Sequence, residues 1–191
     1  MPVPITLVNQ QTISPNLGVD SLNKVILAGA IGTLLVMLFM LLYYRLLGVF
    51  ASLALLIYIA LTLGIFKIVS VTLSLAGLAG FVLTIGMAVD ANILIFERTK
   101  EELRRGISRS TAMDEGFRRA WPSIRDSNTS TIITAIILYF FTSSFVRGFA
   151  LTLFIGVLVS MFSAITTTRL FLKVFLKDKP AARVAAPAGE S

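Results

Sequence analysis

The sequence predicts an all-α membrane protein that crosses the bilayer several times, and two observations carry this prediction. First, 56% of the 191 residues are hydrophobic and only 14% are charged, and the mean hydropathy is +0.87. These values lie far from those of a soluble globular domain. Second, several apolar runs reach about 20 residues, the length that an α-helix needs to cross roughly 30 Å of hydrocarbon. The predicted fold is a polytopic bundle of five transmembrane helices.

Residues 1–23 are expected to form an extracytoplasmic N-terminal segment. A β-prone run at 5–8, followed by Asn, Gln, Ser, Pro and Gly, predicts a strand and then a loop. A disordered leader is the alternative. The segment lacks the basic stretch and short apolar stretch of a cleavable signal peptide, so we do not interpret it as one.

Five apolar or partly apolar spans follow, with predicted bounds 24–44, 49–66, 71–96, 126–141 and 148–171. The link between the first two is very short, which forces an antiparallel hairpin. The third span carries Ser74, Gly77 and Gly80 at helical spacing, where small side chains let another backbone approach closely. The fifth span has a small residue at every fourth position, as in a helix-packing ridge: Gly148, Thr152, Gly156, Ser160, Ala164 and Thr168.

The hydrophilic stretch 97–125 is predicted to be a cytoplasmic loop between the third and fourth spans. It would contain a helical part, a break at Gly106, and a second, amphipathic helix that lies on the membrane surface and ends at Pro122. Residues 24–175 would form the membrane domain, and 176–191 a disordered cytoplasmic tail. Lys and Arg gather in this loop and tail, so the positive-inside rule places the N-terminus outside and the C-terminus in the cytoplasm.

Composition also excludes several function classes. The net charge of +7 could suggest nucleic-acid binding, but the basic residues flank apolar runs, so we expect a lipid bilayer and no nucleic acid as the partner. The sequence contains no cysteine or histidine, and we expect neither a metal nor another cofactor. It also lacks a phosphate-binding glycine loop and a nucleophile beside a base, so we do not expect an enzyme.

Asp90 is the main candidate functional residue, because it is a carboxylic acid inside the apolar third span. An acid in that place is costly in lipid and should face a protein interior or a water-filled path. Gly86 lies one turn earlier and would leave space beside it. A carboxyl group that exchanges protons is what a proton-coupled machine requires. A structural acid bonded to neighbouring hydroxyl groups is the alternative.

Glu97 and Arg125 are candidate partners of Asp90 in a proton relay. Glu97 follows Asp90 by seven residues, so both lie on nearly the same helical face. It could exchange protons at the membrane boundary, or it could only pair with Arg98 or Lys100. Arg125 could pair with Asp90 across helices, or its side chain could extend to the lipid headgroups.

The start of the fourth span is unusually polar for a membrane helix. Ser127, Asn128 and Thr131 could hold Asp90 or water molecules if they face the third span. Their side chains could instead bond back to their own helix.

Three motifs give the chain a family resemblance: GMAVDANILIFER, SNTSTIITAIILYFF and GFALTLFIGVLVSMFSAITTTR. Over nearly the whole chain it closely resembles the SecD family of bacterial protein-export subunits. The resemblance implies a fold in which this chain supplies most of one half of a transporter of the resistance-nodulation-division superfamily, located in the bacterial cytoplasmic (inner) membrane. In that family the aspartate matched by Asp90 is a proton-relay residue, and Asn92 and Glu97 match neighbouring motif positions.

The resemblance also implies a function and partners. SecD subunits pair with SecF and use the proton-motive force to promote preprotein translocation through the SecYEG channel. Two departures stand out. The chain has neither the first membrane helix nor the large extracytoplasmic domain of SecD, so it is expected to be a fragment, a split-gene product or a reduced protein. Arg125 stands three residues before Asn128, where SecF-like sequences carry an arginine, which would place both members of an acid and arginine pair in one chain.

Two other functions are compatible with these patterns. Because a fold does not fix its cargo, the chain could be half of an exporter for small molecules or lipids. It could also be a membrane scaffold without transport activity.

Overall fold

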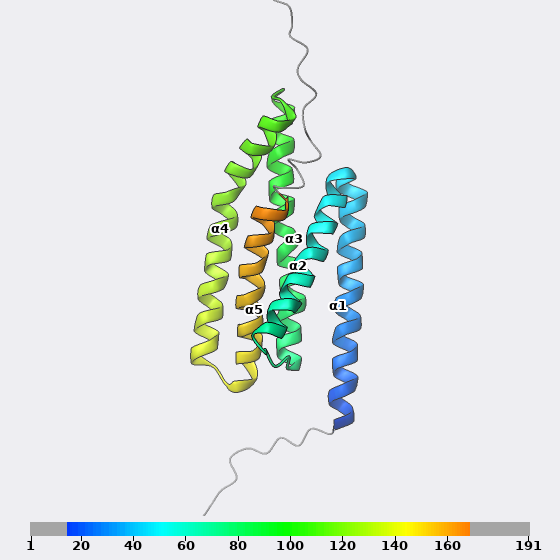
Figure 1. Cartoon of the computed structure of the whole chain (residues 1–191), viewed down its shortest axis with the longest axis vertical. Coiled ribbons are helices and arrows are strands. Elements are labelled where there is room, and N and C mark those ends of the chain that lie inside the picture. The colour runs from blue at the N-terminus through cyan, green and yellow to red at the C-terminus, as the bar shows by residue number, and fades with distance from the viewer. Residues whose placement is uncertain (1–14, 169–191) are drawn as a thin grey trace, which may run out of the picture.

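The computed structural model describes residues 15–168, which form a bundle of five long helices (Figure 1). The helices are α1 (Pro15–Tyr44), α2 (Leu46–Ile68), α3 (Leu75–Arg104), α4 (Arg109–Phe141) and α5 (Ser144–Ser163), and α5 ends in a π-helical turn, η1 (Ala164–Thr168). The strand predicted at 5–8 and the tail at 176–191 lie outside the described residues.

The prediction of an all-α polytopic membrane protein is confirmed. Four helical segments are long and apolar enough to cross a membrane: Gly18–Tyr44, Leu46–Ile68, Leu75–Arg104 and Ser144–Thr166. Helix α4 does not reach this level, because its first half is charged and its second half begins with a polar run. It nevertheless packs lengthwise against α3 and α5, and successive helices run in opposite directions (Figure 1).

Helix α3 is the centre of the bundle and makes its most extensive contact with α5. The hydroxyl of Thr152 donates a hydrogen bond to the carbonyl of Gly77 at 2.9 Å. A Cβ at Gly156 would lie only 2.6 Å from Thr84, and one at Gly80 would lie 2.5 Å from the Thr152 hydroxyl. The prediction that small residues of the third and fifth spans allow a close approach is confirmed.

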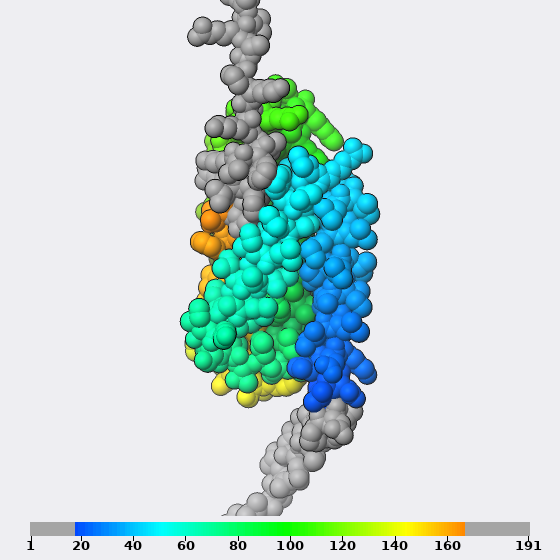
Figure 2. All heavy atoms as spheres, turned by 45° about the vertical axis from the view of Figure 1, so that its right-hand side comes forward, coloured from blue at the N-terminus to red at the C-terminus, as the bar shows by residue number. Residues whose placement is uncertain are grey.

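Helix α1 lies at the edge of the bundle, beside α2 and α3, and α1 and α2 form one continuous side of the molecule (Figure 2). A single residue outside the helices, Arg45, with φ of 50°, joins them. The turn is so tight that a Cβ at Gly48 would overlap the carbonyl of Met40. The short link therefore produces the antiparallel hairpin that the sequence predicts.

The stretch predicted as a loop, 97–125, is helical except at 105–108. Helix α3 continues to Arg104, the chain turns at Gly106 with φ of 82°, and α4 begins after Ser108, whose side chain accepts a hydrogen bond from the Thr111 amide at 3.3 Å. Helix α4 then runs through Pro122 without ending. The prediction of a separate surface helix that ends at this proline is wrong.

Packing against α3 explains why α4 continues past the proline. Proline removes one backbone hydrogen bond and costs about 3 kcal/mol inside a helix. However, α4 buries a residue at every fourth position on both sides of the proline: Ala112, Gly116, Ala120, Ile124 and Asn128. The stripe lies so close to α3 that a Cβ at Gly116 would be 2.6 Å from the Thr99 hydroxyl.

A buried ion pair fixes the hairpin between α3 and α4. The side chain of Glu102 on α3 is only 4% exposed, and it pairs with Arg119 on α4 and with Arg105, the latter at 3.1 Å. A buried carboxylate requires such partners. The hydrophilic stretch is thus a helical hairpin that extends the two membrane helices.

All five helices begin at other residues than predicted, and the starts of α2 and α3 differ by three and four residues. Helix α1 begins at Pro15, not at 24, so the second part of the predicted N-terminal segment is helical. Proline favours the first position of a helix, because its missing N–H is not needed there. Helix α5 begins at Ser144, so the link after α4 consists of residues 142–143.

Candidate functional site

Asp90 lies on the one face of α3 that is turned away from the bundle. The opposite face carries the small residues that pack on α5, so the residues at i, i+4 and i+7 on this side remain open. Asp90 is exposed, as is Gly86 one turn earlier, and Glu97 lies two turns further on the same side. The face is flanked by α1 and α4, which both pack on α3.

A polar hollow of about 290 Å³ lies between α3 and α4, with Asp90 in its wall. On the α4 side its polar lining consists of Ser123, Ser127, Asn128 and Thr131. The structure therefore brings Asp90 together with the polar residues that the sequence singled out. Sequence reasoning missed Ser123, although its position four residues before Ser127 could have indicated it.

A second, mainly apolar hollow of about 390 Å³ lies on the other side of Asp90, between α3 and α1. Val36, Phe39 and Gly86 belong to its lining. A Cβ added at Gly86 would meet no atom within 4 Å. Asp90 thus stands on a ridge between a polar and an apolar hollow, and Gly86 keeps the apolar side open.

The polar side chains of α4 bond to their own helix, which was the alternative that the sequence left open. Asn128 Nδ2 donates to the carbonyl of Ile124 at 2.8 Å, and the Thr131 hydroxyl donates to the carbonyl of Ser127 at 3.2 Å. A hydroxyl whose proton is used in this way still offers lone pairs on its oxygen. This wall can therefore accept a hydrogen bond from a protonated carboxyl group or from water.

The structure does not bring Arg125 to Asp90. Its guanidinium pairs with the neighbouring Asp126 at 3.0 Å, and both side chains are well exposed. Among the described residues, Asp90 takes part in no ion pair.

Glu97 pairs with Lys100 at 3.1 Å, as one of the two interpretations of this residue predicts. The Lys100 ammonium also lies 4.2 Å from the ring centre of Tyr44 and 5.0 Å from that of Tyr43. This cluster connects α3 to the end of α1. At 1.5 Å per residue, Glu97 lies about 10 Å from Asp90 along the helix axis.

Asn92 occupies the opposite face of α3 and is buried, with 4% of its surface exposed. It belongs to the packing of the bundle and not to the lining of either hollow. Sequence reasoning also missed the role of Glu102. The four-residue stripe of small side chains on α4 was the signal that could have indicated a helix packed beside it.

Comparison with known proteins gives a consistent result. Residues 3–178 match the family model described as "Protein export membrane protein SecD/SecF, C-terminal". The chain is 54% identical over 178 residues to the protein translocase subunit SecD of Thermobaculum terrenum, covering 91% of this chain and 35% of that protein. It is 49% identical to the corresponding subunit of a Synechocystis species, covering 96% of this chain and 39% of the relative.

Solved structures agree with the sequence relatives. The crystal structure of SecDF, a translocon-associated membrane protein from Thermus thermophilus, matches with a TM-score of 0.83 and 44% identity, covering 85% of this chain and 23% of that one. A structure of SecDF in a super-membrane-facing form matches with a TM-score of 0.78. The chain spans somewhat more than a third of the length of the two curated relatives.

Proposed function

Because the chain belongs to the SecD/SecF family of protein-export membrane proteins, we propose that it is an accessory subunit of Sec-dependent export that the proton-motive force drives. Asp90 carries the proton in this proposal. The partners are a SecF-like subunit, the SecYEG channel and the preprotein. The chain lies in the bacterial cytoplasmic membrane, with the N-terminus outside and the α3–α4 hairpin in the cytoplasm.

The exposure of Asp90 is the observation that supports this proposal most directly. The residue lies in the middle of a membrane-spanning helix, yet its side chain is open to the outside of the bundle. A carboxylic acid does not face lipid without a large cost in free energy. Another protein surface must therefore cover the face between α1 and α4, and in this proposal a SecF-like half of the transporter supplies it.

The polar hollow gives the proposed relay its chemistry. When Asp90 is protonated, its O–H can donate to a hydroxyl oxygen in the α4 wall. When it is ionised, it needs donors, and the second N–H of Asn128 and the Ser127 hydroxyl belong to the same hollow. Protonation thus changes whether Asp90 donates hydrogen bonds to the α4 wall or accepts them from it. This change can alter the packing of α3 against α4.

Glu97 and Arg125 have secondary roles in the proposed relay. Glu97 lies on the same face toward the hairpin, where it can exchange protons with the cytoplasm. Arg125 is held by an exposed pair with Asp126, and exposed pairs contribute little to stability. It is therefore free to turn toward Asp90 when that residue is ionised.

The proposal is tested by Asp90→Asn in inverted membrane vesicles that contain this chain, a SecF-like partner and the channel. Preprotein translocation is measured with and without a proton-motive force. Asparagine keeps the size and polarity of aspartate but cannot release a proton, so stimulation by the proton gradient should be lost. Translocation without the gradient should be unchanged.

Asp114→Asn is the matched control, because it makes the same chemical change at an exposed acid on α4 that lines neither hollow. This variant should keep the stimulation. Full stimulation of the Asp90→Asn variant would refute the proton relay, and it would favour a scaffold. Co-purification with the partner in both variants would show that assembly is intact.

A further inference from the structure

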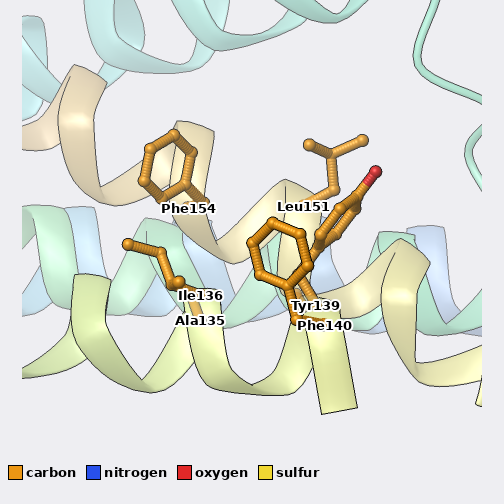
Figure 3. Close-up of a pocket in the computed structure, with 7 residues that line it drawn as sticks. Ala135, Ile136, Tyr139, Phe140, Leu151 and Phe154 are labelled. Carbon is orange, nitrogen blue, oxygen red and sulfur yellow. The ribbon is translucent and has the colours of Figure 1, made fainter. Parts of the chain in front are cut away.

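An apolar hollow of about 220 Å³ lies between α4 and α5, away from Asp90 (Figure 3). Ile136, Tyr139 and Phe140 extend from α4, and Leu151 and Phe154 extend from α5, so the two helices form its walls. The hollow is larger than the roughly 150 Å³ apolar cavity that admits a benzene ring. Its walls suit a hydrocarbon chain.

The hollow spans residues 135–140 of α4 and 150–154 of α5. Phe154 lies ten residues into α5, which corresponds to about 15 Å from the helix start. This depth is half of the roughly 30 Å hydrocarbon core. The inner end of the hollow thus lies about half a hydrocarbon core from the start of α5, and its outer end, at Ala150, lies about 9 Å from that start.

Arg147 lies about one turn before the hollow along α5, toward the start of the helix. It precedes Leu151 by four residues and Phe154 by seven, so the three side chains share one face of α5. It is exposed, and it is the only charged residue in the sequence from 127 to 168. Among the described residues no carboxylate pairs with it. The start of a helix, where Arg147 lies, already carries a positive potential, so an unpaired cation there favours an anion.

We propose that this groove binds a phospholipid with an anionic headgroup. One acyl chain occupies the apolar hollow, and the phosphate group contacts Arg147. The charge favours a lipid over a protein helix. A helix laid in the groove would leave the arginine without a counter-ion unless it also supplied an acid at that level.

Photo-crosslinking of the whole chain in bilayers tests the inference. The probes are phosphatidylglycerol and phosphatidylcholine that carry the same diazirine in one acyl chain, and mass spectrometry measures labelling of residues 136–154. We expect about fivefold stronger labelling by phosphatidylglycerol, the factor that one surface cation contributes to anionic lipid binding. Arg147→Gln should bring the ratio close to one.

Lys67→Gln is the matched control, because Lys67 is an exposed cation at the end of α2 and does not line the groove. It should leave the ratio unchanged. Leu151→Trp, which fills the groove, should reduce labelling by both lipids. Equal labelling by the two lipids in the unaltered chain would overturn the inference, as would an equal effect of Lys67→Gln and Arg147→Gln. Labelling no stronger than that of the exposed face of α1 would show that protein covers the groove, and would also overturn it.

Discussion

Replacing Gly156 with alanine tests the close packing of α5 on α3. The added Cβ would lie 2.6 Å from both Cγ2 and Oγ1 of Thr84 and 2.7 Å from its Cβ. Thr84 is fully buried. Its Cβ is attached directly to the backbone, so a change of rotamer cannot move it away. The two helices must therefore separate at this point.

The expected magnitude follows from two opposing contributions. Overpacking of a buried contact costs about 1–3 kcal/mol, and the backbone-attached neighbour places this site near 3 kcal/mol. Alanine in place of glycine favours the helix by about 1 kcal/mol. The net loss in the free energy of unfolding is about 2 kcal/mol, which lowers the melting temperature of a chain of this size by about 4–8 °C.

Thermal unfolding of the purified chain in detergent, followed by circular dichroism, measures the effect. Gly64→Ala is the matched control, since a Cβ at Gly64 on α2 would meet nothing within 4 Å. This variant should melt at the same or a slightly higher temperature. Combining Gly156→Ala with Thr84→Ala removes two of the three close atoms and should recover part of the loss. An unchanged melting temperature in Gly156→Ala would refute the packing argument.

Three further predictions concern the charged end of the bundle. Arg119→Gln leaves buried Glu102 with one exposed partner and should reduce the free energy of unfolding by about 2 kcal/mol; an unaltered melting temperature would contradict a structural ion pair. Arg118 lowers the pKa of Glu115, so any contribution of this pair to stability is present above the ordinary pKa of glutamate and is lost as the pH falls. Both side chains are solvated, so that contribution is close to zero; Glu115→Gln should leave melting at neutral pH unchanged, and a clear drop would contradict this. Lys100→Met should increase hydrogen exchange in residues 40–48, because it removes the cation that connects α3 to α1, and equal exchange would exclude that role.

The apolar helices could be predicted from the sequence because long apolar runs have few alternatives. Small residues at helical spacing in α3 and in α5 likewise indicated that each helix packs closely against a neighbour, but not that the two pack against each other. Hydropathy does not identify the hairpin between α3 and α4. Its stability depends on Glu102 and Arg119, which lie 17 residues apart and meet only after folding.

In the candidate site, too, some features could be predicted from the sequence and others could not. Asp90 was identifiable because an acid is rare in an apolar helix, and the polar start of the fourth span was identifiable for the same reason. The rotation of α3 and α4 about their axes decides that Arg125 faces Asp126 and not Asp90. It also places Asp90 between two hollows. Local sequence does not determine that rotation; the packing of Gly116 against Thr99 and of Gly156 against Thr84 does.

The polarity of α4 has a consequence for how the chain is held in the membrane. Helices α1, α2, α3 and α5 are each apolar enough to partition into lipid alone. Helix α4 falls below that level, so its place in the membrane depends on neighbours that cover its polar side chains. Since α4 packs on both α3 and α5, these two helices are those neighbours. The residues that build the wall opposite Asp90 are thus the ones that make α4 depend on the rest of the bundle.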